Sequence, residues 1–135
     1  MYRKCRHKIL LFTFFVLLFI SSFSQTKSDS GIIGTWKGES ICQIKNSPCH
    51  DEIAAYHVSK AKEPNVFHFE MNKIVNRKEE EMGPLEFIYN AATQTLTSID
   101  EKRNTIWKFQ IKDTAMEGAL MYNGELYRII HLKKQ

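Results

Sequence analysis

The chain has 135 residues, of which 19 are basic and 15 are acidic, so its formal net charge at pH 7 is +4. Residues 1–24 contain four of the basic residues and no acidic one, which leaves 15 of each sign and a net charge of zero in residues 25–135. A domain with this balance lacks the basic face that a nucleic acid requires, so we predict no nucleic-acid partner. Residues 25–135 have the length of one ordinary domain.

The N-terminal segment, residues 1–24, has the layout of a cleavable signal peptide. Basic residues precede an unbroken apolar run at 9–20, and two small residues, Ser22 and Ser24, follow it. We expect cleavage after Ser24 and export of the protein to the periplasm or the extracellular space. The apolar run is shorter than the roughly 20 residues of a membrane-spanning helix, so we predict no permanent membrane anchor; an uncleaved anchor is the alternative.

The remainder of the chain has the period of strands. Residues 25–31 are polar and small, and we expect a flexible leader there. Over residues 32–135 the apolar residues recur at every second position, which predicts β-structure. The eight expected strands cover residues 33–42, 53–59, 67–71, 85–89, 95–99, 107–111, 116–122 and 126–132.

Three connections carry their own signals. Ser47 and Pro48, followed by two acidic residues, are typical of a helix start, so we expect one helical turn before the second strand. The charged stretch 77–81 is expected to be a solvated loop. Asn123-Gly124 predicts a tight hairpin turn before the last strand, because both positions tolerate a positive φ.

Strands joined by short turns pair antiparallel, and eight of them can close on themselves and remove their exposed edges. We therefore predict an all-β fold for residues 32–135, an eight-stranded antiparallel up-and-down barrel. A two-sheet β-sandwich is the alternative.

Gly34-Thr35-Trp36, near the start of the first expected strand, resembles the Gly-x-Trp motif of the lipocalins and the wider calycin group. Those barrels pack a basic residue of the last strand across the tryptophan, and Arg128 lies on the apolar face of the last expected strand. The resemblance implies a short bacterial lipocalin-like domain in which Trp36 and Arg128 close one end of the barrel through a cation–π contact. Alternatively, Arg128 extends into solvent at the barrel mouth.

The expected inward face supplies the candidate ligand-binding residues. They are aromatic or apolar side chains at every second position of the expected strands: Phe69, Phe87, Tyr89, Trp107, Phe109, Leu120 and Tyr122. Tyr89, Tyr122 and Arg128 are the polar groups that could orient an anionic or hydroxylated head group.

Such a barrel holds either its own side chains or one small ligand. We predict non-catalytic binding of a small apolar or amphipathic molecule. The alternative is an inhibitor-type or interaction module with a filled barrel, whose loops at 46–51, 73–83 and 100–104 contact a protein partner in the cell envelope.

Cys42 and Cys49 form an even pair in a chain expected in an oxidising compartment, and we predict a disulfide between them. Their spacing is unlike that of zinc sites, so we predict no metal site with His50 and His57. We assign the strand histidines mainly to the outside, without a neighbouring nucleophile, and the sequence has no nucleophile elbow or phosphate-binding loop. We therefore predict neither enzymatic activity nor a cofactor.

Overall fold

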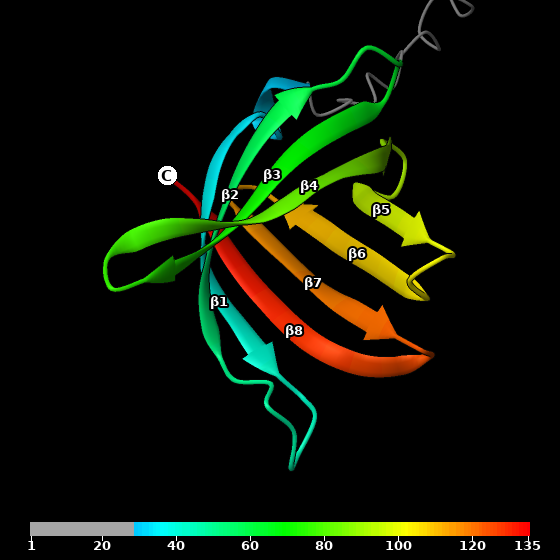
Figure 1. Cartoon of the computed structure of the whole chain (residues 1–135). Coiled ribbons are helices and arrows are strands. Elements are labelled where there is room, and N and C mark those ends of the chain that lie inside the picture. The colour runs from blue at the N-terminus through cyan, green and yellow to red at the C-terminus, as the bar shows by residue number, and fades with distance from the viewer. Residues whose placement is uncertain (1–28) are drawn as a thin grey trace, which may run out of the picture.

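The computed structural model describes residues 29–135 and contains a closed barrel of eight antiparallel strands (Figure 1). The strands are β1 (Gly34–Cys42), β2 (Glu52–Lys60), β3 (Val66–Val75), β4 (Lys78–Asn90), β5 (Thr95–Asp100), β6 (Thr105–Lys112), β7 (Ala115–Tyr122) and β8 (Glu125–Lys134). Each strand pairs with the next along the chain, and β8 pairs with β1. The predicted up-and-down barrel is confirmed, since the pairing of β1 with β8 closes a sheet that a sandwich would leave open.

The chain before the barrel is only partly described. The expected signal peptide and residues 25–28 of the expected leader lie outside the described residues. The last three leader residues form a short 3-10 helix, η1 (Asp29–Gly31), which is bonded to Lys60 and Lys134. These three residues are therefore attached to the barrel by hydrogen bonds.

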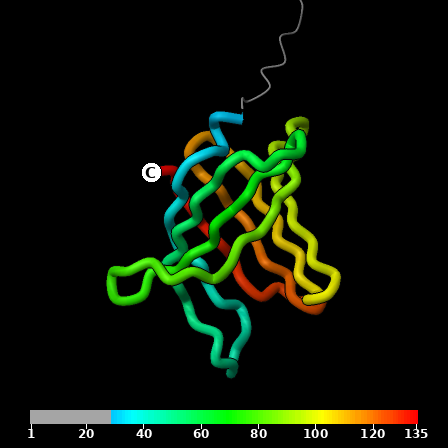
Figure 2. The backbone as a smooth tube through the Cα atoms, turned by 45° about the horizontal axis from the view of Figure 1, so that its top comes forward, coloured from blue at the N-terminus to red at the C-terminus, as the bar shows by residue number. Residues whose placement is uncertain are grey.

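The barrel has two different ends. The η1 helix and the turns at 61–65, 91–94 and 113–114 lie at one end, which we call the closed end. The connections at 43–51, 76–77, 101–104 and 123–124 leave from the other end, which we call the mouth. Figure 2 shows two of these connections projecting well beyond the barrel wall: the β1–β2 loop and the β3–β4 hairpin.

The β3–β4 connection is a two-stranded arm, and the expected loop at 77–81 is wrong. The turn consists of Asn76 and Arg77, both with positive φ, and β4 begins at Lys78. The charged side chains find partners across strands: Glu79 accepts hydrogen bonds from Asn72 and His57, at 2.8 and 2.7 Å. Charge in this stretch therefore supports a hairpin rather than a solvated loop.

The β1–β2 loop is closed by the predicted disulfide between Cys42 and Cys49, which is confirmed. Residues 43–51 contain no helical turn, so that expectation is wrong. The Ser47 hydroxyl accepts from the backbone N–H of Cys49 at 3.2 Å, and Asp51 accepts from the N–H of Cys42 at 2.9 Å. The side chains that suggested a helix cap instead bind the backbone of a stapled loop.

Side chains fill the middle of the barrel. Tyr56, Phe69, Phe87 and Phe109 form one aromatic cluster, with ring centroids of neighbouring pairs 4.3 to 6.5 Å apart. Gly118 faces Phe109 in the β6–β7 register and leaves room for its ring. Burial of each such ring contributes about 1.5–3 kcal/mol, so this cluster is a main source of stability.

The seam between β4 and β5 is short. β4 pairs with β5 only through Ile88, Tyr89 and Asn90, so the two strands diverge toward the mouth (Figure 1). A β-bulge lies on the other side of β4, where Met82 is an extra residue between the pairs of Gly83 and Glu81 with β3. The bulge bends β4 into the arm and away from β5, so these two strands are paired at the closed end and separate toward the mouth.

Candidate functional site

A lysine, and not the expected arginine, closes the barrel over Trp36. The indole is fully buried, and its Nε1–H donates to the carbonyl of Ile32 at 2.8 Å. Lys134 lies opposite Trp36 in the β1–β8 register, with Nζ 5.7 Å from the ring centroid. The same Nζ donates to the carbonyls of Ser30 and Gly31 at 3.1 and 3.0 Å.

Arg128 lies at the mouth, opposite Cys42 in the register, and the expected contact between Trp36 and Arg128 is wrong. Because Trp36 and Cys42 are six positions apart on β1, the two ends are separated by about 20 Å. The side chain is nevertheless only 11% exposed, so the alternative of a snorkelling arginine is also wrong.

Arg128 belongs to a largely buried polar group inside the mouth. Its Nη1 donates to the carbonyl and hydroxyl of Ser40, at 3.3 and 3.2 Å, and to the carbonyl of His50 at 3.2 Å. The carboxylate of Glu52, which is 13% exposed, lies 3.5 Å from Nη1. Several hydrogen bonds and one counter-charge therefore hold the guanidinium in place.

Tyr56 is the third titratable member of this region. Burial raises the pKa of its phenol far above the ordinary value, while the charge of Arg128 lowers it and that of Glu52 raises it further. The hydroxyl therefore stays protonated at neutral pH and can donate a hydrogen bond. We call Ser40, Glu52, Tyr56 and Arg128 the mouth cluster.

A pocket of about 430 Å³ opens where β4 and β5 diverge. We call it the seam pocket; it is lined by Met71, Met82, Gly83, Pro84, Leu85, Arg103, Thr105 and Trp107. Leu85 and Trp107 are half-buried and pack against the barrel core, and the Trp107 ring is stacked on Phe109 with centroids 6.4 Å apart. The pocket therefore has an apolar wall that continues into the core.

The guanidinium of Arg103 lies at the rim of the seam pocket. Arg103 is exposed, and its Nε lies 3.6 Å from a carboxylate oxygen of Asp100 in the same turn. An exposed ion pair of this kind contributes little, about 0–1 kcal/mol. The guanidinium is therefore available to another anion at small cost.

The structure separates the residues that we expected to share a ligand site. Phe69, Phe87 and Phe109 belong to the packed cluster, and Tyr89 is buried at the closed end, where its ring meets Phe67 at 6.0 Å. The expectation that Tyr89 and Arg128 orient one head group is therefore wrong.

The remaining expected residues lie near the mouth. Trp107, Leu120 and Arg128 are consecutive cross-strand neighbours on the inner face. Tyr122 is 45% exposed and packs on Tyr127, with centroids 5.7 Å apart, so it lies at the rim of the mouth and outside the packed interior.

Sequence reasoning missed the seam pocket, and of the mouth cluster it identified only Arg128. Glu52 has the same parity as Ala54, Tyr56 and Val58, so alternation along β2 could have identified it as an inward acid. For the pocket, the signal was Gly83-Pro84 within a strand, a pair that marks bulges and unpaired edges.

The strand histidines lie on the outer face, and each contacts a glutamate of another strand. His57 pairs with Glu79 and His68 with Glu86, both at 2.7 Å, and His131 pairs with Glu117. The hydrogen bond from His57 is the main cause of the lowered pKa of Glu79, and the bond from Asn72 adds to it. The pairs of His68 and His131 join adjacent strands, and the pair of His57 joins β2 to the arm across β3.

Residues 29–135 contain no group of three or more side chains arranged to hold a metal ion. The sulfurs of Cys42 and Cys49 are bonded to each other and so cannot act as thiolate ligands. In this part of the chain no helix is long and apolar enough to cross a membrane. No protein-family model and no curated protein sequence matches the chain.

Proposed function

We propose that this protein is an exported, lipocalin-like carrier that binds one small amphipathic molecule without chemistry, in the seam pocket. The observation that carries the proposal is the pocket itself, in which Leu85 and Trp107 offer an apolar wall and Arg103 offers a cation at the rim. Its volume of about 430 Å³ is within the range of small-ligand pockets.

The arrangement favours a ligand with one apolar tail and one negative charge. The tail would lie between Leu85 and Trp107, because these side chains gain from losing contact with water. An anionic head group would replace Asp100 beside Arg103, with the Thr105 hydroxyl as a further donor. Medium-chain carboxylic acids have this chemistry.

The lipocalin-like assignment and the export have separate support. Trp36 of the Gly-x-Trp motif is covered by a basic residue of the last strand, as the resemblance implies, although that residue is Lys134. The disulfide between Cys42 and Cys49 suits an oxidising compartment.

Fluorescence titration tests the carrier function. Octanoic acid should change the emission of Trp107 saturably, and the change should disappear in a folded Trp107→Phe variant, because Trp36 is buried at the closed end. Leu85→Trp should abolish binding by filling the pocket. No saturable change with octanoic acid or octanol would contradict the proposal.

The head-group assignment has its own test. Arg103→Gln should weaken octanoate binding about two- to fivefold, the size of an exposed charge interaction, and leave octanol unaffected. Lys102→Gln, in the same turn, is the matched control and should change neither. Equal effects of the Arg103 and Lys102 variants would mean that only the general charge of the turn matters.

The filled middle of the barrel favours a second candidate function, a protein-interaction module that uses the projecting loop and arm. Native mass spectrometry of protein taken from its own host separates the two functions. A retained small mass supports the carrier, and a retained foreign polypeptide supports the module.

A further inference from the structure

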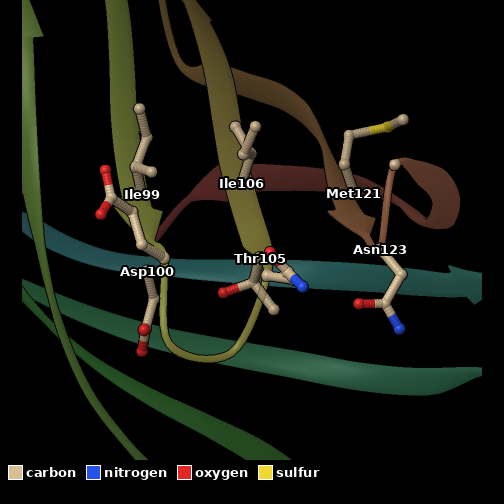
Figure 3. Close-up of a pocket in the computed structure, with 9 residues that line it drawn as sticks. Ile99, Asp100, Thr105, Ile106, Met121 and Asn123 are labelled. Carbon is tan, nitrogen blue, oxygen red and sulfur yellow. The ribbon is translucent and has the colours of Figure 1, made fainter.

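An unbroken row of apolar side chains crosses the outer face of four neighbouring strands near the mouth. Ile99 pairs with Ile106, Ile106 with Met121, and Met121 with Leu126, so the row runs from β5 to β8. Figure 3 shows Ile99, Ile106 and Met121 pointing to the same side, whereas Asp100 and Thr105 point away from it. We call these four residues the apolar row.

The apolar row is exposed to solvent, which is unfavourable for apolar side chains. Ile99 is 64% exposed and Ile106 is 44% exposed. Three strand spacings make the row about 14 Å wide. Next to it on the same face, Ala119 pairs with Ile129, which continues the apolar surface. Single exposed apolar residues are ordinary, but a contiguous patch of this kind marks a contact surface.

Opposite charges lie on the two sides of the row. Lys108 follows Ile106 by two positions on β6 and so shares its outer face, away from the turn. Glu101 lies at the turn, on the other side, and lines a pocket of about 460 Å³ together with Ile99 and Ile106. Neither Lys108 nor Glu101 forms an ion pair with another residue of the described part of the chain.

We propose that the apolar row is the interface between two copies of this protein, related by a two-fold axis that runs along the row between the two faces. This axis reverses the strand direction, so Lys108 of each copy lies opposite Glu101 of the other. The row of one copy then packs on the row of the second at the ordinary sheet-to-sheet distance of about 10 Å.

Two observations favour a second copy over a different occupant. The surface is self-complementary in both charge and apolarity, which is what an isologous interface requires. Residues 25–135 have a net charge of zero, so two copies do not repel each other. A lipid surface is a poorer match, because the carboxylate of Glu101 at the edge of the row has no favourable interaction with the phosphate of a lipid headgroup.

Sedimentation of the exported protein over a range of concentrations tests the interface. The wild type should shift from the monomer to the dimer mass as its concentration rises. Ile106→Asp should raise the dimer dissociation constant about tenfold or more, because it places a charge at the centre of the row. Ile53→Asp is the matched control: Ile53 is 48% exposed on β2, a strand that contributes no residue to the row, and its substitution should leave the dimer intact. Circular dichroism checks that both variants are folded.

A charge exchange tests the two-fold arrangement. Lys108→Glu and Glu101→Lys should each weaken the dimer, and the combined variant should restore it, because each pair is formed between copies. A protein that is monomeric at all concentrations, or a dimer that Ile106→Asp leaves intact, would overturn the proposal. Binding of a monomeric wild type to phosphatidylcholine vesicles through Ile106 would also overturn it in favour of a membrane contact. Failure of the dimer leaves the titration of Trp107 unchanged, so this proposal and the carrier function fail separately.

Discussion

Replacement of Lys134 by Ala should lower the free energy of unfolding by about 1.5 to 3 kcal/mol. The Nζ atom donates two hydrogen bonds, to the carbonyls of Ser30 and Gly31 at 3.1 and 3.0 Å. Each contributes about 0.5–1 kcal/mol at a partly exposed site, and the contact with the Trp36 ring at 5.7 Å adds about 0.5–1 kcal/mol. The substitution therefore loosens η1 and uncovers the indole at the same time.

Urea unfolding followed by tryptophan emission measures this effect. Lys133→Ala is the matched control, since Lys133 is the neighbouring residue on β8 and its side chain is exposed on the outer face. Lys134→Met keeps the apolar stem and removes the charge, so it should recover only a small part of the free energy of unfolding that Lys134→Ala loses. A loss below about 0.5 kcal/mol for Lys134→Ala, the size of ordinary surface substitutions, would refute the assignment of Lys134 as the closing residue.

Three further perturbations have defined outcomes. Arg128→Ala should cost about 2–4 kcal/mol in a urea titration, because it leaves the largely buried Glu52 carboxylate without its cation; a near-neutral result would mean that water reaches that carboxylate. Gly118→Ala should lower the melting temperature by about 5 °C or more, because the added Cβ would overlap the Phe109 ring; an unchanged melting curve would contradict the close packing. The raised pKa of Tyr56 means that the folded state holds its proton above pH 10, the ordinary value, where the unfolded state loses it, so stability should fall as the pH rises past 10. Tyr56→Phe should flatten that alkaline decline in pH-dependent unfolding, and an unaltered slope would assign the decline to other groups.

The strands could be predicted from the sequence because side-chain direction in a strand depends on parity alone. Parity assigned Phe69, Phe87 and Phe109 to the inner face, and all three are buried. The number of strands and their short turns predicted a closed barrel, with a two-sheet sandwich as the alternative, and the pairing of β1 with β8 decides between them.

Parity does not determine which residues lie opposite each other. Arg128 and Lys134 are both on the inner face of β8, six positions apart, and either could have covered Trp36. The choice depends on the register between β1 and β8, strands that are far apart in the chain, and no local signal near either residue reports it. Because the register could not be predicted, Arg128 was assigned to the position over Trp36 that Lys134 occupies.

Local sequence patterns were also ambiguous where contacts with distant residues determine the backbone conformation. Ser47 and Pro48 have the chemistry of a helix cap, but the disulfide between Cys42 and Cys49 holds their segment in a loop. In the arm, Asn76 adopts the positive φ of a tight turn without the glycine that made Asn123-Gly124 recognisable.

The position of the seam pocket follows from two residues in β4. Pro84 has no N–H to donate and is disfavoured in a strand paired on both sides, and it lies in the part of β4 that pairs with β3 alone. Gly83, with φ of 119°, allows the backbone bend beside the bulge. Together they divert β4 from β5 and leave Leu85 and Trp107 half-buried beside the opening instead of within a closed wall. The interruption of one strand pairing thus gives an otherwise filled barrel an apolar pocket that is open to solvent.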